Sequence, residues 1–90
     1  MEVLNKRIIQ VKILGATNTK GTRIKLIESR YNTTDTFVMS YDYRHRDMAD
    51  QAIEYLENKG IKIEGKGDFN GATFLFSNSW ADNTEFVTIN

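Results

Sequence analysis

Hydrophobic and polar residues alternate along three runs in the first half of the chain, which is the period-two pattern of half-buried β-strands. The runs predict strands at Ile8–Leu14, Thr22–Tyr31 and Thr36–Tyr43. A polar loop at Gly15–Gly21 and a turn at Asn32–Asp35 separate them, and both are rich in turn-forming residue types. The Asn and Gly residues of the loop tolerate the left-handed region of backbone space. Three consecutive strands with short connections predict an antiparallel meander.

The hydrophobic spacing then changes to three and four residues and predicts one amphipathic helix from Arg44 or Asp47 to Lys59. Its apolar stripe consists of Met48, Ala49, Ala52, Ile53 and Leu56. The rest of its surface is polar and consists of Asp47, Asp50, Gln51, Glu54, Glu57 and Asn58. Acidic residues in the first turn complement the helix dipole, and Lys59-Gly60 is a typical helix stop.

The last third of the chain returns to strand patterns. It predicts a strand that includes the short run Ile61–Glu64 and ends near Phe69, and a strand at Ala72–Ser77, with a hairpin turn at Asn70-Gly71 between them. A final edge strand is predicted as an option at Glu85–Ile89. The expected fold is therefore one α+β domain over residues 1–90, with the order β-β-β-α-β-β and a possible sixth strand. One helix packs on one face of an antiparallel sheet of about five strands.

Composition narrows the environment of this domain. The 90 residues include no cysteine, so neither a disulfide nor a thiolate zinc site supports the core. No stretch approaches the roughly 18 apolar residues that a membrane span needs, and the first residues lack the apolar run of a signal peptide. We therefore expect a cytosolic protein without a membrane partner.

Charge is distributed unevenly along the chain, although the formal net charge is zero. Residues 1–34 carry seven basic and two acidic side chains, whereas residues 35–90 carry five basic and ten acidic ones. If the two parts form different faces of the folded domain, each face can attract a partner of opposite charge.

Candidate catalytic groups are sparse. The single histidine, His45, lies beside Arg44 and Arg46 at the helix entry, and no serine or cysteine motif supplies a nucleophile for it. Asp42, Asp47 and Asp50 are candidate oxygen ligands for a divalent ion, but capping and dipole roles explain them more simply. The sequence predicts a protein that is not an enzyme and has no cofactor or metal.

Two binding functions remain open. Nucleic-acid binding draws on cations of the first two strands and their loop, which are Lys12, Lys20, Arg23 and Lys25. Against it, Phe37, Met39 and Tyr41 suit the core better than an open stacking platform, and cations on a strand also protect a sheet against edge-to-edge pairing. Binding to another protein draws on the acidic half and on a tryptophan anchor, through Asp50, Glu54, Glu57 and Trp80. Ordinary solvation of the helix face, and a core position for Trp80, are the alternatives.

Residues 13–25 resemble a segment of small uncharacterised proteins of bacteriophages, plasmids and other bacterial mobile elements, with the pattern Leu-Gly-x-Thr-Asn-x-x-Gly-Ser/Thr-Arg-Ile-Lys. Tyr41-Asp42-Tyr43, shortly before an Ala-rich helix, is also similar to those proteins, and the likeness runs over roughly residues 11–76. This chain has Ser40 where a proline is usual, and a longer tail from Asn78. The resemblance implies a phage or mobile-element accessory protein made in bacterial cytoplasm, and it implies no activity.

Small phage proteins without enzymatic groups commonly bind a component of the host, and inhibitors of restriction or CRISPR nucleases are one such class. By this analogy we expect a non-enzymatic viral protein that binds a host protein, possibly as an anti-CRISPR or anti-restriction inhibitor of a defence nuclease. The alternative is a small nucleic-acid-binding module that uses the basic hairpin of the first two strands. The oligomeric state stays open, and a homodimer through the last strand is one option.

Overall fold

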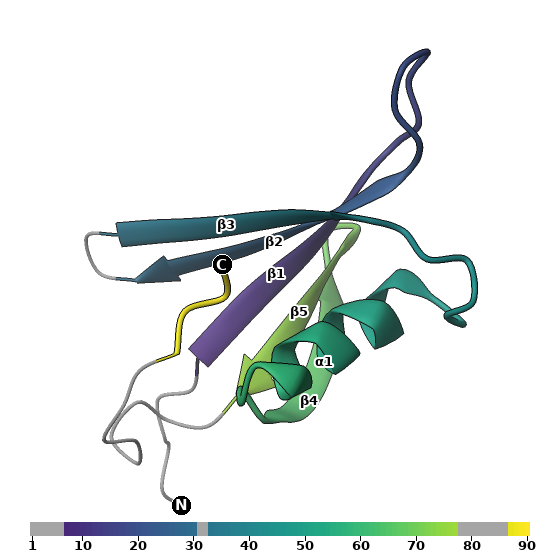
Figure 1. The fold of residues 1–90 in the computed structure, drawn as a ribbon. Coiled ribbons are helices and arrows are strands. Elements are labelled where there is room, and N and C mark those ends of the chain that lie inside the picture. Colours follow the sequence, from purple (N-terminus) through teal and green to yellow (C-terminus); the bar gives the residue numbers. More distant parts are fainter. Residues whose placement is uncertain (1–6, 31–32, 78–86) are drawn as a thin grey trace, which may run out of the picture.

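A computed structural model gives the structure of the chain and describes residues 7–30, 33–77 and 87–90 (Figure 1). The strands pair in the order β3-β2-β1-β5-β4, and every neighbouring pair is antiparallel. The predicted α+β fold, with five strands and one helix in the order β-β-β-α-β-β, is confirmed. The elements are β1 (Arg7–Leu14), β2 (Arg23–Arg30), β3 (Thr33–Ser40), α1 (Met48–Asn58), β4 (Ile63–Phe69) and β5 (Ala72–Ser77).

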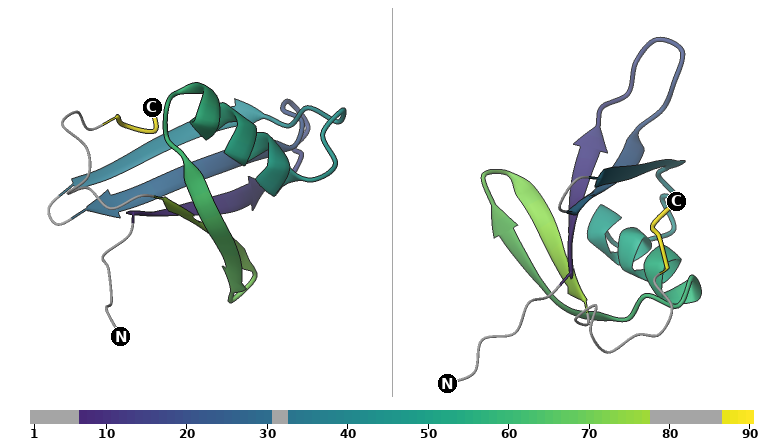
Figure 2. Two further views of the ribbon diagram at one scale, coloured as in Figure 1. Left: turned by 90° about the horizontal axis from the view of Figure 1, so that it is seen from below. Right: turned by 90° about the vertical axis from the view of Figure 1, so that its left-hand side faces the viewer.

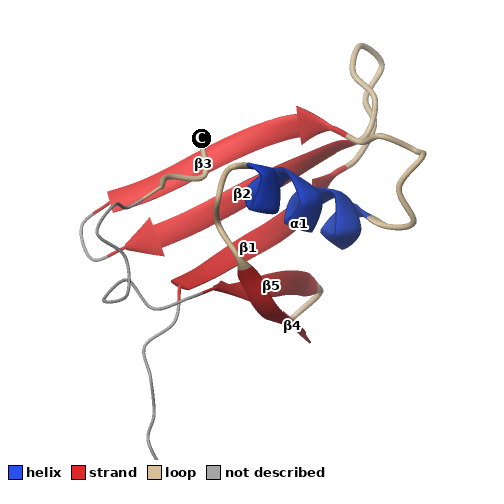
Figure 3. Ribbon diagram, turned by 60° about the horizontal axis from the view of Figure 1, so that its bottom comes forward, coloured by secondary structure: helices blue, strands red, loops and turns tan. Residues whose placement is uncertain are grey.

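The core lies between one face of the sheet and α1 (Figure 3). The register places Val11 opposite Leu26 and Ile9 opposite Leu75, so that alternate residues of three central strands point toward the helix. All four side chains are buried, and Leu56 of α1 is buried among the same cluster. Burial of each large aliphatic side chain contributes about 1.5–3 kcal/mol, so this layer supplies most of the stability of so small a domain.

Both ends of α1 follow the sequence signals. The Asp47 side chain accepts the N–H of Asp50 and caps the helix, which therefore starts at the later of the two predicted positions. At the other end Gly60 has φ of 98°, and Ile61 donates its N–H to Leu56 across the last turn. This bond and the positive φ of Gly60 are features of a Schellman motif, which ends a helix. The predicted Lys59-Gly60 terminus is therefore confirmed. Within the described residues no helix is long and apolar enough to cross a membrane.

The predicted tight hairpin between β4 and β5 is confirmed. Asn70 and Gly71 have φ of 52° and 76°, the two positive values that a two-residue turn needs to match the twist of its strands. The β1–β2 loop is built differently and extends beyond the sheet (Figure 1). It is closed by hydrogen bonds between Thr17 and Lys20, and its Asn and Gly residues do not use the left-handed region.

The third strand occupies a different stretch from the predicted one. β3 begins at Thr33 and pairs with β2 without interruption, so the predicted turn at Asn32–Asp35 is wrong for its last three residues. Threonine is a good strand former, and pairing with β2 overrides the local turn preference. At its other end the strand stops at Ser40, because the Asp42 carboxylate accepts the N–H of Arg44 and turns the chain toward α1.

The two strands that the predicted order places after the helix are present, but the first begins later than predicted. β4 starts at Ile63 and continues to Phe69. Ile61 is buried in the helix stop, and a bulge between Ile63 and Gly65 keeps the following residues paired with β5. The optional strand at Glu85–Ile89 is wrong for residues 87–89, which form no strand, and its first two residues lie outside the described ranges.

The last residues of the chain complete the core on the helix side of the sheet (Figure 2). Ile89 is fully buried, and its carbonyl accepts the hydroxyl of Tyr55 at 2.7 Å. At the same end of the sheet, the buried Arg7 guanidinium binds the Glu28 carboxylate through two hydrogen bonds and donates a third to the Val87 carbonyl. A buried ion pair thus joins β1, β2 and the C-terminal residues.

Gln51 corrects one assignment on the helix. The sequence places it on the polar surface, but it is 8 % exposed. Its side-chain oxygen accepts the N–H of Asp42 and its NH2 donates to the Ser40 carbonyl, so it ties α1 to the end of β3. A single polar side chain therefore satisfies two backbone groups that β3 leaves unpaired.

His45 gives a pH-dependent contribution to stability. Its Nε2 lies 2.7 Å from the Glu54 carboxylate, and this hydrogen bond, with a smaller contribution from Asp42, raises the pKa of His45 above the ordinary 6.5. A raised pKa means that the contribution is complete below the unfolded-state pKa and is lost as the pH rises through the folded-state pKa. We expect Glu54→Gln to return the pKa of His45 toward 6.5, which NMR titration of the single histidine measures directly. An unchanged titration curve would contradict the contact.

Candidate nucleic-acid interface

No helix of the described residues covers the face of the sheet opposite α1, which is called the open face here. Its side chains follow from the strand registers, since directly paired residues lie on the same face. Its cations are Lys12, Arg23 and Lys25. Its apolar residues include Ile8, Ile27, Val38, Phe69, Phe74 and Phe76. At the positions with an assigned register, which exclude the bulged Glu64, this face has no carboxylate. It is therefore a cationic and partly apolar surface.

Two phenylalanines of β5 lie side by side on the open face. Leu75 between them is fully buried toward α1, so Phe74 and Phe76 point the other way, and both are half-buried. Phe76 is paired with Ile8, which is 49 % exposed. Gly67 lies opposite Phe74 and has no side chain. A Cβ built on Gly67 would lie 3.6 Å from the Phe76 ring. Because Gly67 has no side chain, the Phe76 ring has space beside it.

Two lysines face one another on the same surface. Lys12 of β1 is directly paired with Lys25 of β2, and within the described ranges neither forms an ion pair or a side-chain hydrogen bond. Like charges directly opposite one another destabilise a sheet, by up to about 1 kcal/mol. A local arrangement that disfavours the fold is a reason to look for a ligand that compensates it. The ligand that compensates two cations is an anion.

A third cation lines a groove at the end of this face. The groove, of about 360 Å³, is lined by Lys20 from the β1–β2 loop, by Arg23, and by Val38 and Ser40 of β3. The Nε of Arg23 is buried and has no hydrogen-bond partner among the described residues. A buried N–H donor without an acceptor is costly. Arg23 lines the groove, and a guanidinium is a good partner for a phosphate oxygen. We call this the Arg23 groove.

The four predicted cations, Lys12, Lys20, Arg23 and Lys25, therefore come together as the hairpin model requires. Three lie on the open face, and Lys20 joins Arg23 at its end. The side chains of Phe37, Met39 and Tyr41 pack against the core, as predicted. Phe74 and Phe76 were not among the binding residues predicted from the sequence. The alternation of β5 contained this signal, because burial of Leu75 fixes both neighbours on the opposite face.

The acidic residues lie on the helix side and do not form one surface with the cations. Glu57 is exposed, Glu54 is exposed but bonded to His45, and Asp50 is half-buried in the first helical turn. Trp80 lies outside the described residues. The condition that the basic and acidic parts form different faces is met by Lys12, Arg23 and Lys25, because these cations and α1 lie on opposite sides of the sheet. It is not met by Arg7, which is buried on the helix side with Glu28.

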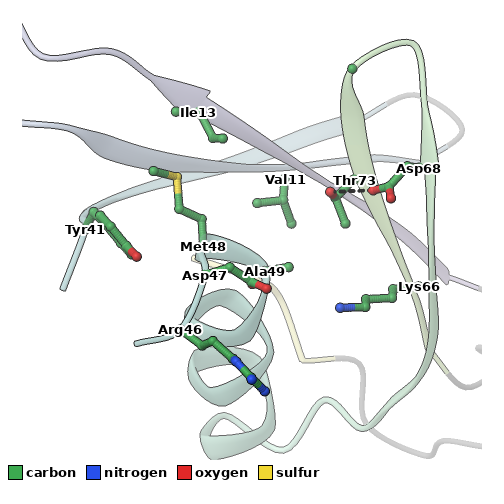
Figure 4. Close-up of a pocket in the computed structure, with 11 residues that line it drawn as sticks. Val11, Ile13, Tyr41, Arg46, Asp47, Met48, Ala49, Lys66, Asp68 and Thr73 are labelled. Atoms are coloured by element: carbon green, nitrogen blue, oxygen red, sulfur yellow. Dashed lines mark hydrogen bonds between the residues drawn. The ribbon is translucent and has the colours of Figure 1, made fainter. Parts of the chain in front are cut away.

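The helix side also has a pocket of about 400 Å³ between the start of α1 and the β4–β5 hairpin (Figure 4). Its floor includes Val11 and Ile13, and Lys66 extends across it toward the helix. Ile13 lies on the core face of β1 but is 62 % exposed, because α1 begins too late to cover it. The carboxylates here already have partners, since Asp68 accepts the Thr73 hydroxyl.

The groups considered for catalysis and metal binding are engaged with one another. His45 contacts Glu54, and Asp42 accepts three side-chain hydrogen bonds from Arg44, which hold the pKa of Asp42 at about 2. Asp47 serves as the helix cap, so the three aspartates do not converge. Within the described residues no three acidic, histidine or cysteine side chains are placed to hold a metal ion.

Comparison of the chain with protein-family models, with curated proteins and with solved structures finds no match in any of the three.

Proposed function

We propose that this protein is a binding module for single-stranded nucleic acid and that the open face is its binding surface. The observation that carries the proposal is the cross-strand pair Lys12–Lys25 beside two adjacent phenylalanines, Phe74 and Phe76. Cations track a phosphate backbone, and aromatic rings stack on bases that are not paired in a duplex. Few other ligands need both at once.

The layout of the surface supports binding of a nucleic-acid strand that runs across the β-strands of the sheet. The phenylalanines lie on β5, the lysine pair lies on β1 and β2, and the Arg23 groove lies between β2 and β3. A single strand that runs from β5 toward β3 would meet first the stacking residues and then the cations. The exposed apolar side chains between them, such as Ile8, favour unpaired bases over the hydrated backbone of a duplex.

Fluorescence anisotropy with labelled single-stranded DNA, single-stranded RNA and a duplex of the same sequence tests the proposal at low and moderate salt. We expect the single strands to bind more tightly than the duplex, with an affinity that falls as salt rises. Absence of binding to either single strand at low salt would overturn the proposal. Equal affinity for the duplex would remove the stacking part of it.

Neutralising one lysine of the pair should separate binding from folding. We expect Lys25→Gln to lower the affinity for a single strand and to reduce the slope of log affinity against log salt by about 0.7, because one phosphate contact is lost. The same change relieves the repulsion with Lys12, so the free energy of unfolding should rise, by about 0.2–1 kcal/mol. Chemical unfolding followed by circular dichroism measures the second quantity.

The matched control is Glu57→Gln, which neutralises an exposed charge on the helix side of the sheet. It should leave the salt slope unchanged. A Lys25→Gln protein that loses stability and keeps its affinity would show that the lysine serves the fold, and it would contradict the assignment. The anionic helix surface of Asp50, Glu54 and Glu57, and with it inhibition of a host nuclease, stays a prediction, as does the phage origin.

A further inference from the structure

The two edges of the sheet differ in how well they resist pairing with another strand. β4 at one edge has a bulge, two internal glycines and the charges Glu64, Lys66 and Asp68. β3 at the other edge has eight residues in unbroken register with β2, and it contains no basic residue, proline or bulge. Bulges and charges are the usual protection of an edge strand. The only charge of β3 is Asp35, which pairs with Glu28 on the helix side of the sheet, so β4 is the better protected edge.

The outward backbone groups of β3 can be identified. Tyr41 donates its N–H to Thr22, which directs Tyr41 and the odd-numbered residues before it toward β2. The even-numbered residues therefore direct their N–H and C=O groups away from the sheet. The Ser40 carbonyl is already bonded to Gln51 of α1, which leaves Thr34, Thr36 and Val38 without backbone partners among the described residues. This free row is symmetric about Thr36.

We propose that β3 pairs with β3 of a second copy of this chain, antiparallel and about a twofold axis through Thr36. Thr36 then lies opposite itself, and Thr34 lies opposite Val38 of the second copy, so all three free residues are hydrogen-bonded. Asp35 lies opposite Phe37 rather than opposite another carboxylate. The α1 backbone lies over β1, β2 and β4 (Figure 3). The helix reaches β3 only through side chains, with Tyr55 stacked on Phe37 and Gln51 bonded to the Ser40 carbonyl, so it does not occupy the outward backbone groups of Thr34, Thr36 and Val38.

The pairing itself does not depend on the proposed function. Only its consequence for nucleic-acid binding rests on that function. A twofold axis perpendicular to the sheet keeps both open faces on the same side, so the two sets of cations and phenylalanines form one continuous surface. The Arg23 grooves, which include Val38 and Ser40 of β3, come next to the junction. A long single strand can then contact both copies, whereas a short one contacts only one.

Sedimentation velocity without nucleic acid tests the pairing independently of the proposed function. We expect a dimer, and we expect Thr36→Pro to raise its dissociation constant at least about tenfold, because proline removes the central outward N–H but no bond to β2. Circular dichroism verifies the fold of the variant. A protein that stays monomeric from micromolar to millimolar concentration, or a dimer that Thr36→Pro does not weaken, would overturn the proposal.

A cysteine variant provides a second measurement that does not depend on proline. The chain has no cysteine, so Thr36→Cys introduces a single thiol at the axis, where opposite Cα atoms lie about 5.5 Å apart, within disulfide range. We expect rapid disulfide-linked dimer under mild oxidation, and much slower linkage for Lys66→Cys on the β4 edge. Equal rates for the two variants would contradict the pairing.

The length of the nucleic acid tests whether the dimer matters for binding. If both proposals hold, a long single strand should bind the dimer about 100-fold or more tightly than a short one, and Thr36→Pro should abolish that difference while keeping the short-strand affinity. If nucleic acid does not bind at all, the sedimentation and cross-linking results still decide the pairing.

Discussion

Replacing both open-face phenylalanines by leucine, Phe74→Leu with Phe76→Leu, should nearly abolish binding to single-stranded nucleic acid. Each stacked base contributes about 1–3 kcal/mol, so loss of both rings should raise the dissociation constant by roughly 30-fold or more. Leucine keeps apolar area on the sheet but has no aromatic face. Because both side chains are half-buried and lie outside the core, the unfolding free energy should change little. Anisotropy and chemical unfolding measure the two effects.

Two further variants show whether the aromatic face is what matters. Phe74→Tyr keeps a ring at the same position and should keep most of the affinity. Tyr43→Leu removes an aromatic side chain that is 75 % exposed but lies outside the strands, so it should have no effect on binding. If the double leucine variant binds as tightly as the unmodified protein, the rings do not stack on bases, and the open face loses its role as a platform.

The sequence predicted the cations of this surface better than its aromatic residues, for a physical reason. Lys12, Arg23 and Lys25 are visible because charge is rarely buried, so a cation on an alternating strand almost always marks the exposed face. Phenylalanine gives no such signal, since it occupies cores and platforms alike. Which face of β5 is buried depends on its pairing with β1, where Leu75 meets Ile9, and that pairing crosses more than sixty residues of sequence.

Element types were predictable and element ends less so, again for identifiable reasons. The helix stop at Gly60 and the turn at Asn70-Gly71 are set by local backbone conformation, which the sequence encodes directly. The ends of β3 are set by its partner strand and by the side chain of Gln51, which reaches it from α1. No local pattern contains that contact.

Breaking the buried ion pair should affect stability more than any other single change considered for this chain. Arg7 and Glu28 are 3 % and 1 % exposed and are joined by hydrogen bonds of 2.7 and 2.8 Å. Glu28→Gln removes the carboxylate that two hydrogen bonds join to the buried guanidinium, and removal of one partner of such a pair costs about 3–5 kcal/mol. A domain of this size has roughly 5–13 kcal/mol in all, so the variant should be only marginally folded.

The double variant Arg7→Met with Glu28→Leu shows whether the loss of stability in Glu28→Gln comes from the buried charge or from lost packing. With no charge left to desolvate, it should recover most of the lost stability, apart from the bond to the Val87 carbonyl, which contributes about 1 kcal/mol. Urea unfolding of both single variants and the double variant completes a mutant cycle. The exposed pair Arg44–Asp42 is the matched control, and Arg44→Gln should change stability far less. If Glu28→Gln behaved like that control, the pair would be solvated, and the C-terminal residues would have to be held by Tyr55 and Ile89 instead.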